Sequence, residues 1–180
     1  MSTLSHLLSD NTHLIRQGLA VLGDLDGDLY CSPLPDAGLS GIGGHFRHCI
    51  DFYERFLACL AEDNPRLDYD SRDRDEQLER CPSTASARLE QVVRRLETLV
   101  PGAARRELLI KSDAVGESAA STVWARSTVE RELQVLLSHT VHHYALIAVA
   151  LRLHGLEVDP EFGVAPSTLR YWQEQRACAR

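Results

Sequence analysis

The sequence predicts an all-α protein, a four-helix bundle with a small β-hairpin between the third and fourth helices. Four segments of the 180-residue chain place apolar residues three, four and seven positions apart, which is the pattern of an amphipathic helix. The connections are short and contain Gly, Pro and Asp, and one of them includes two β-capable runs. The length suits a single domain covering residues 1–180, arranged as an up-down bundle or a close variant.

The first helix is expected over about residues 2–22, followed by a loop over 23–35 that is rich in Gly, Asp and Pro. The second helix is expected to begin with Ser40 as its N-cap and to end near residue 62. Three glycines occupy its first turn, each about 1 kcal/mol less favourable than Ala in a helix. They indicate a close backbone approach, either to another helix or to a ligand. These glycines are Gly41, Gly43 and Gly44.

The third helix is expected over about residues 72–99, with a break at Cys81-Pro82, and Pro101-Gly102 stops it. The runs 107–111 and 122–126 flank a loop containing Gly and Ser, and they form the predicted hairpin.

The fourth helix has the clearest start in the chain. Ser127 and Glu130 match a capping box, and Gly155 suits the position just after the helix. The tail that follows is expected to include a short docking turn or helix beginning at Pro166.

Composition excludes several classes of protein. The formal net charge of −7 argues against a nucleic-acid-binding protein. The five cysteines include no C-x-x-C pair, so a disulfide framework is not expected. The N-terminus lacks the apolar core of a signal peptide, and no run approaches the roughly 18 apolar residues of a membrane span. We therefore expect a cytoplasmic protein without nucleic-acid or membrane partners.

The histidines suggest a metal site. His139 and His143 lie four residues apart in the fourth helix, so both can face one ion. The same stripe is apolar, and coordination is one way to satisfy two buried imidazoles. A third ligand must come from another helix, and His48 in the second helix is preferred, with His45 as the alternative.

Two motifs and the tail resemble the DinB/YfiT-like superfamily. GGHFRHCIDFYE (residues 43–54) resembles the motif of its second helix, and SHTVHHYALI (138–147) resembles that of its final helix. FGVAPSTLRY (162–171) is similar to the tail of bacterial DinB-like proteins. The resemblance covers the whole chain in helix order, although the specific motifs occupy only about 35 residues.

The resemblance implies a metal-binding triad of His48, His139 and His143. In that superfamily such histidines hold Zn²⁺, Ni²⁺ or another divalent ion at the mouth of a four-helix bundle, usually in a homodimer. Imidazole ligands suit Zn²⁺, Ni²⁺, Cu²⁺ and Fe²⁺ alike, so the sequence does not select the metal. Three protein ligands leave at least one coordination position open, which is the pattern of a catalytic site.

Four further residues near the predicted ligands are candidates for other roles. Glu132 is a candidate general base, with a solvated first-turn carboxylate as the alternative. Asp51 could orient a ligand histidine by accepting its second ring N–H. His142 is expected beside the ligands or on the surface, and Cys49 is expected in the core.

The sequence supports two functions for a metal site. The first is a metal-dependent enzyme acting on a small molecule, either a transferase for a low-molecular-weight thiol or a hydrolase. The second is a non-catalytic metal-binding or stress-response protein. A third interpretation is that the histidines are ordinary core residues. Neither the substrate nor the reaction follows from the sequence.

Overall fold

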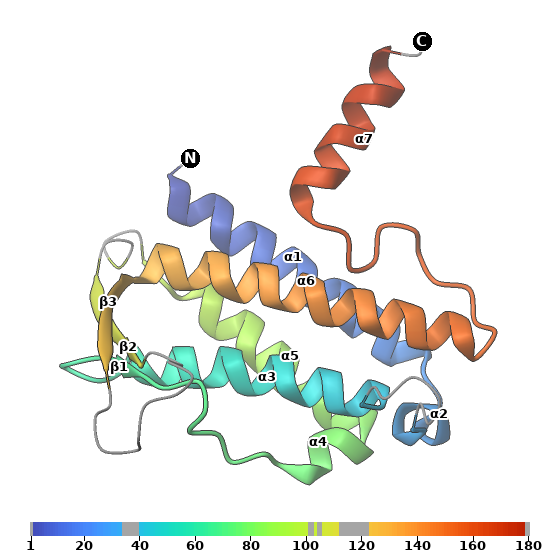
Figure 1. The fold of residues 1–180 in the computed structure, drawn as a ribbon, viewed down its shortest axis with the longest axis horizontal. Coiled ribbons are helices and arrows are strands. Elements are labelled where there is room, and N and C mark those ends of the chain that lie inside the picture. The colour runs from blue at the N-terminus through green and yellow to red at the C-terminus, as the bar shows by residue number, and fades with distance from the viewer. Residues whose placement is uncertain (1, 34–39, 101–102, 104–105, 112–122, 179–180) are drawn as a thin grey trace.

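Four long helices form the protein. The computed structural model describes residues 2–33, 40–100, 103, 106–111 and 123–178. The predicted all-α bundle, with a hairpin between its third and fourth long helices, is confirmed (Figure 1). The long helices are α1 (Thr3–Asp24), α3 (Ile42–Cys59), α5 (Pro82–Glu97) and α6 (Val129–Leu153).

The arrangement of the helices is a variant of the simple up-down bundle. Both α1 and α3 pack against α5 and α6, so α1 and α3 lie diagonally opposite each other. Helices α3 and α5 run in one direction, and α1 and α6 run in the other (Figure 1). The antiparallel contact between α3 and α6 is the one that carries the histidines.

Two short helices lie in the connections. Helix α2 (Gly27–Cys31) forms within the loop predicted over residues 23–35, and α4 (Glu76–Arg80) precedes α5. The predicted break at Cys81-Pro82 is confirmed, because Pro82 is the first residue of α5. Helix α4 begins where the Asp75 carboxylate accepts a hydrogen bond from the Gln77 backbone N–H at 2.9 Å.

Gly43 shows why the start of α3 contains glycine. Helix α3 begins with Gly41 as its N-cap, one residue after the predicted Ser40. A Cβ atom on Gly43 would overlap the backbone carbonyl of Glu79 and would lie 2.9 Å from the Tyr30 ring. This glycine therefore allows α4 to pack closely on α3, and of the two predicted explanations the packing one holds for Gly43.

A three-stranded sheet closes one end of the bundle. Strand β2 (Glu107–Lys111) pairs antiparallel with β3 (Trp124–Thr128), as predicted, and parallel with the two-residue β1 (Arg66–Leu67). The sequence did not predict β1, because two residues are too few to show a period of two. The hairpin loop at 112–122 and the stop at Pro101-Gly102 lie outside the described residues.

The start of α6 differs from the predicted capping box. Its N-cap is Thr128, whose hydroxyl accepts from the Arg131 backbone N–H at 3.2 Å. Ser127, the predicted cap, still pairs in β3, and its hydroxyl donates instead to the Glu132 carboxylate. The far end of α6 agrees with the prediction, since Gly155 follows it with a φ of 79°.

The tail packs on the bundle before its helix begins. Phe162 is buried, and its ring stacks on that of Tyr144 in α6 with centroids 4.9 Å apart. Helix α7 (Pro166–Cys178) forms at the predicted proline but buries no side chain. It extends away from the bundle (Figure 1), so the expectation that this helix docks is wrong.

A buried polar network joins three of the long helices. The Tyr53 hydroxyl of α3 donates to the Asn11 side-chain oxygen of α1 at 2.7 Å. The Asn11 amide group donates to the Leu7 carbonyl and to the Leu133 carbonyl of α6, at 2.8 and 3.1 Å. Because such groups are costly to bury without partners, this network favours one register of α1, α3 and α6.

Helix α6 is long and apolar enough, by length and composition alone, to cross a membrane. The core helix of a bundle has the same composition, and α6 packs against both α1 and α3. Its apolar face is therefore explained by the bundle.

Candidate metal centre

Three histidines meet where α3 crosses α6. His48 of α3 and His139 and His143 of α6 each offer one ring nitrogen, and these nitrogens lie within 4.8 Å of one another. The ring centroid of His48 lies 4.9 Å from that of His139 and 4.6 Å from that of His143. Among the described residues, this group contains no fourth histidine, cysteine or carboxylate. We call these residues the three-histidine cluster.

His139 is held by an aromatic neighbour. Its ring stacks on Phe52 with centroids 4.2 Å apart and an interplanar angle of 17°. The other neighbour of Phe52 is Tyr69, stacked at 4.5 Å. The Nε2 atom of His139 is buried and has no hydrogen-bond partner in the part of the chain that the structure describes. A buried nitrogen without a partner is costly, and a bound cation would satisfy it.

His143 is oriented by His45, the residue predicted as the alternative third ligand. The Nδ1 atoms of His45 and His143 lie 2.9 Å apart, so one ring donates to the other. This contact occupies Nδ1 of His143 and leaves its Nε2 for another partner. The structure thus brings His48 into the cluster, and it places His45 behind His143.

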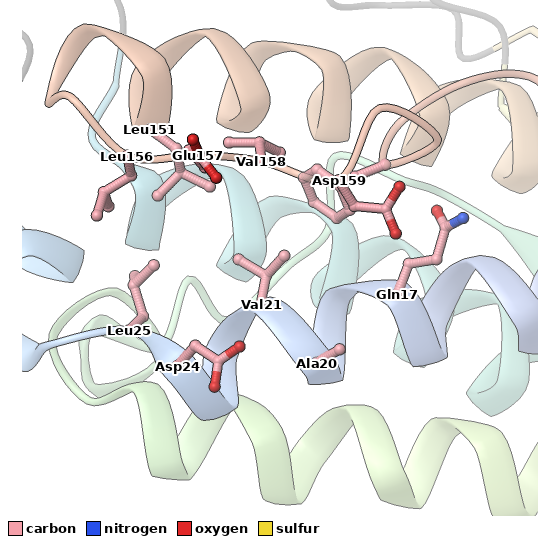
Figure 2. Close-up of a pocket in the computed structure, with 11 residues that line it drawn as sticks. Gln17, Ala20, Val21, Asp24, Leu25, Leu151, Leu156, Glu157, Val158 and Asp159 are labelled. Carbon is pink, nitrogen blue, oxygen red and sulfur yellow. The ribbon is translucent and has the colours of Figure 1, made fainter.

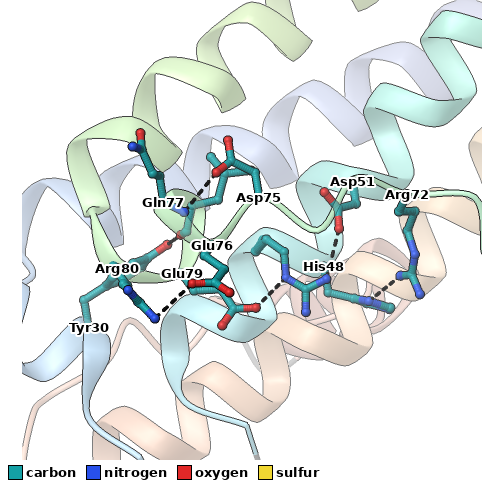
Figure 3. A network of polar contacts seen from close by, with 11 residues as sticks. Tyr30, His48, Asp51, Arg72, Asp75, Glu76, Gln77, Glu79 and Arg80 are labelled. Carbon is teal, nitrogen blue, oxygen red and sulfur yellow. Dashed lines mark hydrogen bonds and ion pairs between the residues drawn. The ribbon is translucent and has the colours of Figure 1, made fainter.

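His48 has a cation as its neighbour. The Arg72 guanidinium lies 2.7 Å from His48 Nδ1 through its Nη1 atom (Figure 3). It also lies over the Phe52 ring, 5.1 Å from the centroid. Because arginine only donates, Nδ1 of His48 must accept in this arrangement. Nothing in the sequence pattern indicated Arg72, since it belongs to an irregular polar connection between α3 and α4.

Burial lowers the pKa of every histidine in the cluster. The pKa falls to about 4 for His48 and His139 and to about 3 for His143. Desolvation is the largest cause, and the positive charges of neighbouring groups, including Arg72 for His48 and His139, add to it. All three rings are therefore neutral at pH 7, which is the form that binds metal.

Glu132 does not join the cluster. It is fully buried, so the expected solvated first-turn carboxylate is wrong. Its oxygens accept hydrogen bonds from Tyr69 at 3.0 Å and from Ser127. Those bonds tie the start of α6 to the connection that follows α3. The role of Glu132 as a general base stays a prediction.

The other three candidate residues near the cluster do not contact the three histidines as ligands. Asp51 accepts from Arg47 at 3.0 Å, and it makes no hydrogen bond to His48, contrary to the expectation that it could orient a ligand (Figure 3). His142 is exposed beside His143, and Cys49 is buried in the core, both as expected. The sequence predicted that the Asp51 carboxylate could accept a hydrogen bond from His48. In the structure, the Arg72 guanidinium donates a hydrogen bond to His48 instead.

The described residues fit a divalent cation. The cluster offers three neutral nitrogens close together, one of them buried without a partner. Imidazole nitrogens are common ligands of divalent transition metals. With three protein ligands, such an ion would have at least one further coordination position.

A pocket lies elsewhere in the fold, away from the three-histidine cluster. It has a volume of about 380 Å³ and lies between the end of α1 and the chain that follows α6 (Figure 2). Its lining includes Val21, Leu25 and Leu151, with the carboxylates of Asp24 and Asp159 near them. No histidine is among its described lining residues, so the cluster remains the better candidate for chemistry.

Comparison with known families identifies the chain. The model of the DinB superfamily matches residues 13–147, which include all three histidines of the cluster. The chain belongs to the DinB superfamily. The match to the DinB superfamily agrees with the helical bundle and with the resemblance of its second and final long helices.

One curated protein resembles part of this DinB-superfamily chain. A protein of Rhizopus delemar named FK506-binding protein 5 is 33% identical over 110 residues. The aligned part covers 61% of this chain and 28% of that protein, so the chain spans little more than a quarter of its relative. No solved structure matches the chain significantly.

Proposed function

We propose that His48, His139 and His143 bind one divalent metal ion, and that the protein is a metal-dependent enzyme. The observation that carries the proposal is the buried, unpartnered Nε2 of His139 beside two further histidine nitrogens. Membership of the DinB superfamily supports it. Zn²⁺, Ni²⁺ and Fe²⁺ all suit such ligands, and availability often decides among them.

The protein's own residues would fix the ligands. Phe52 sets the plane of the His139 ring, and His45 sets that of His143. Burial keeps all three imidazoles neutral, so protons do not compete for their lone pairs near pH 7.

The chemistry would be thiol transfer or hydrolysis of a small-molecule substrate. A divalent ion with an open position stabilises a thiolate or a hydroxide at neutral pH, and either species attacks an electrophilic carbon. Retention of one open position supports an enzyme, because purely structural zinc sites are closed by four protein ligands.

Metal analysis tests the site. The protein is loaded separately with Zn²⁺, Ni²⁺ and Fe²⁺, desalted, and analysed by mass spectrometry beside single alanine variants. We expect about one metal per chain in the wild type, and a loss of affinity of tenfold or more for His48→Ala, His139→Ala and His143→Ala. His142→Ala is the matched control, because it removes an exposed histidine next to a ligand. Unchanged binding in all three cluster variants would refute the site.

A second measurement separates an enzyme from a non-catalytic protein. Metal-loaded protein is screened with small thiols against a reactive electrophile and with activated esters. Turnover that disappears with chelation and in His139→Ala supports the enzyme. Tight metal binding with a higher melting temperature and no turnover favours the alternative, a metal-binding or stress-response protein.

Two further properties belong to this proposal. We propose a homodimer, as the resemblance to the superfamily implied, and a cytoplasmic location. Light scattering at several concentrations tests the dimer, and microscopy of a tagged chain tests the location.

A further inference from the structure

Arg72 has an unusual set of contacts beside the three-histidine cluster. Its Nη1 atom donates to His48 at 2.7 Å, while its Nε atom is buried and has no hydrogen-bond partner among the described residues. Among the described residues, no carboxylate lies within ion-pair distance of it, although seven other Arg and Lys side chains form such pairs. Arg72 is therefore a half-buried cation that forms no ion pair with a carboxylate of the described residues.

Two carboxylates of α3 that line a pocket with Arg72 already have partners. Asp51 pairs with Arg47 at 3.0 Å, and Glu54 pairs with Arg88 through two bonds of 2.6 Å. Arg72 and these two acids line a pocket of about 540 Å³, which lies beside α3 and the connection to α4. Its other charged lining residues are Arg55, Asp73, Asp75 and Arg88.

Arg55 also lines this pocket and, among the described residues, also has no carboxylate within ion-pair distance, but its Nε atom donates to the Asp68 carbonyl at 3.3 Å. Arg72 differs from Arg55 because its Nε atom has no partner among the described residues and because it contacts the three-histidine cluster.

Arg72 cannot keep its hydrogen bond to His48 when His48 ligates a cation, because the imidazole has too few lone pairs for both. A neutral imidazole has one lone pair and one N–H. In the described arrangement, the lone pair is on Nδ1 and Arg72 uses it. Ligation through Nδ1 removes that lone pair, and ligation through Nε2 leaves an N–H on Nδ1 facing the guanidinium. In both cases Arg72 must move away from His48.

We propose that Arg72, once released from His48, binds the anionic group of the substrate at the edge of the cluster. The inference rests on the proposed metal site and specifies its substrate class, which is a small molecule carrying a carboxylate, sulfonate or similar group. A released guanidinium keeps all five N–H donors, and it binds oxyanions by charge-assisted hydrogen bonds. Phe52 limits its movement, because the guanidinium lies over that ring.

The position of Arg72 depends on the connection between α3 and α4. Tyr69, three residues earlier, is fixed by stacking on Phe52 and by its hydrogen bond to Glu132. Asp68 is held by Lys111 of β2 at 3.0 Å. The segment that carries Arg72 is thus anchored just before it, and the side chain can exchange partners without moving the backbone.

The test uses cobalt-loaded protein and two thiols of the same chain length. The probes are 2-mercaptoethanesulfonate, which carries an anion that ligates metals poorly, and neutral 2-mercaptoethanol. Binding is followed by the visible spectrum of Co²⁺ and by calorimetry. The variants are Arg72→Gln and, as the matched control, Arg94→Gln, whose exposed side chain pairs with Glu90 on the surface of α5.

Wild type and Arg94→Gln should bind the sulfonate thiol about tenfold or more tightly than the neutral thiol, which is the expected effect of a charge-assisted bond. Arg72→Gln should reduce this preference by a similar factor. The same variant should also bind Co²⁺ more tightly than wild type, because no guanidinium then competes for His48.

The outcomes separate the two proposals. Failure of wild type to bind Co²⁺ refutes the metal site, and the inference with it. Normal Co²⁺ binding, with the same thiol preference in Arg72→Gln as in wild type, refutes only the inference. Binding of neither thiol to the cobalt protein also refutes it.

Discussion

Each histidine of the cluster has a different kind of neighbour. His139 packs on an aromatic ring, His143 shares a hydrogen bond with His45, and His48 accepts from a guanidinium. Stacking occupies neither nitrogen of His139, and the His45 contact leaves a lone pair on Nε2 of His143 when the Nδ1–H of His143 donates, whereas the Arg72 contact uses the lone pair of His48. His48 is therefore the residue whose surroundings must change most when the site is filled.

Cys81 is the cysteine whose pKa falls below its usual range. Hydrogen bonds from the side chains of Ser83 and Thr84 stabilise its thiolate and lower the pKa to about 7. Cys81 is the residue directly before α5, so both donors come from the first turn of that helix. Burial has the opposite effect on Cys49, raising its pKa to about 12.

The pH dependence of alkylation tests the pKa of Cys81. Only the thiolate reacts, so the rate at this site should rise with pH with a midpoint at about 7. Ser83→Ala removes one donor and should move the midpoint upward. Site-resolved mass spectrometry after iodoacetamide treatment measures the rate. A midpoint that does not respond to Ser83→Ala would contradict the assigned cause.

The site depends on the register between two antiparallel helices. His45 of α3 lies opposite His143 of α6, and Phe52, seven residues later in α3, lies opposite His139. His48 lies between them and reaches both rings of α6. Steps of three and four residues along α3, and of four residues along α6, keep all these side chains on the shared face.

Tyr53→Phe tests the polar network that favours this register. The change removes one hydroxyl and leaves the buried side-chain oxygen of Asn11 without its donor. We expect the free energy of unfolding to fall by about 1–3 kcal/mol. Tyr171→Phe is the control, since Tyr171 is 57% exposed, and it should change stability by less than about 0.5 kcal/mol. Equal losses in the two variants by denaturant unfolding would show that the network does not stabilise the fold.

On the scale of the molecule, the tail has two parts with different energetic roles. The part before α7 buries Phe162 on Tyr144, whereas α7 buries no side chain. Stability should therefore depend on the first part and hardly on the second.

Phe162→Ala and a truncation after Ala165 test this division. Phe162→Ala should cost about 3–5 kcal/mol, because it opens a cavity against Tyr144. Removal of residues 166–180 should cost less than about 1 kcal/mol, because α7 buries no side chain. Thermal and denaturant unfolding at low protein concentration measure both. A truncation as costly as Phe162→Ala would mean that α7 packs against the bundle or a second chain.

Periodic features of the chain were readable from the sequence. The four long helices, the break at Pro82, the hairpin and the pairing of His139 with His143 all follow from patterns repeated along one element. Such patterns are local, so one sequence contains them in full. Motif resemblance added His48, which periodicity alone did not separate from His45.

The contacts between segments that are distant in the sequence were decided by the tertiary structure alone. Arg72 reaches His48 from an irregular connection, Glu132 is buried by Tyr69 and Ser127, and α7 remains undocked. The sequence determined the helical bundle and its histidine stripe, because burial of apolar faces imposes a period on the chain. The partner of each histidine was set only when α3, α6 and the connection to α4 packed together, because contacts between distant segments leave no period in the sequence.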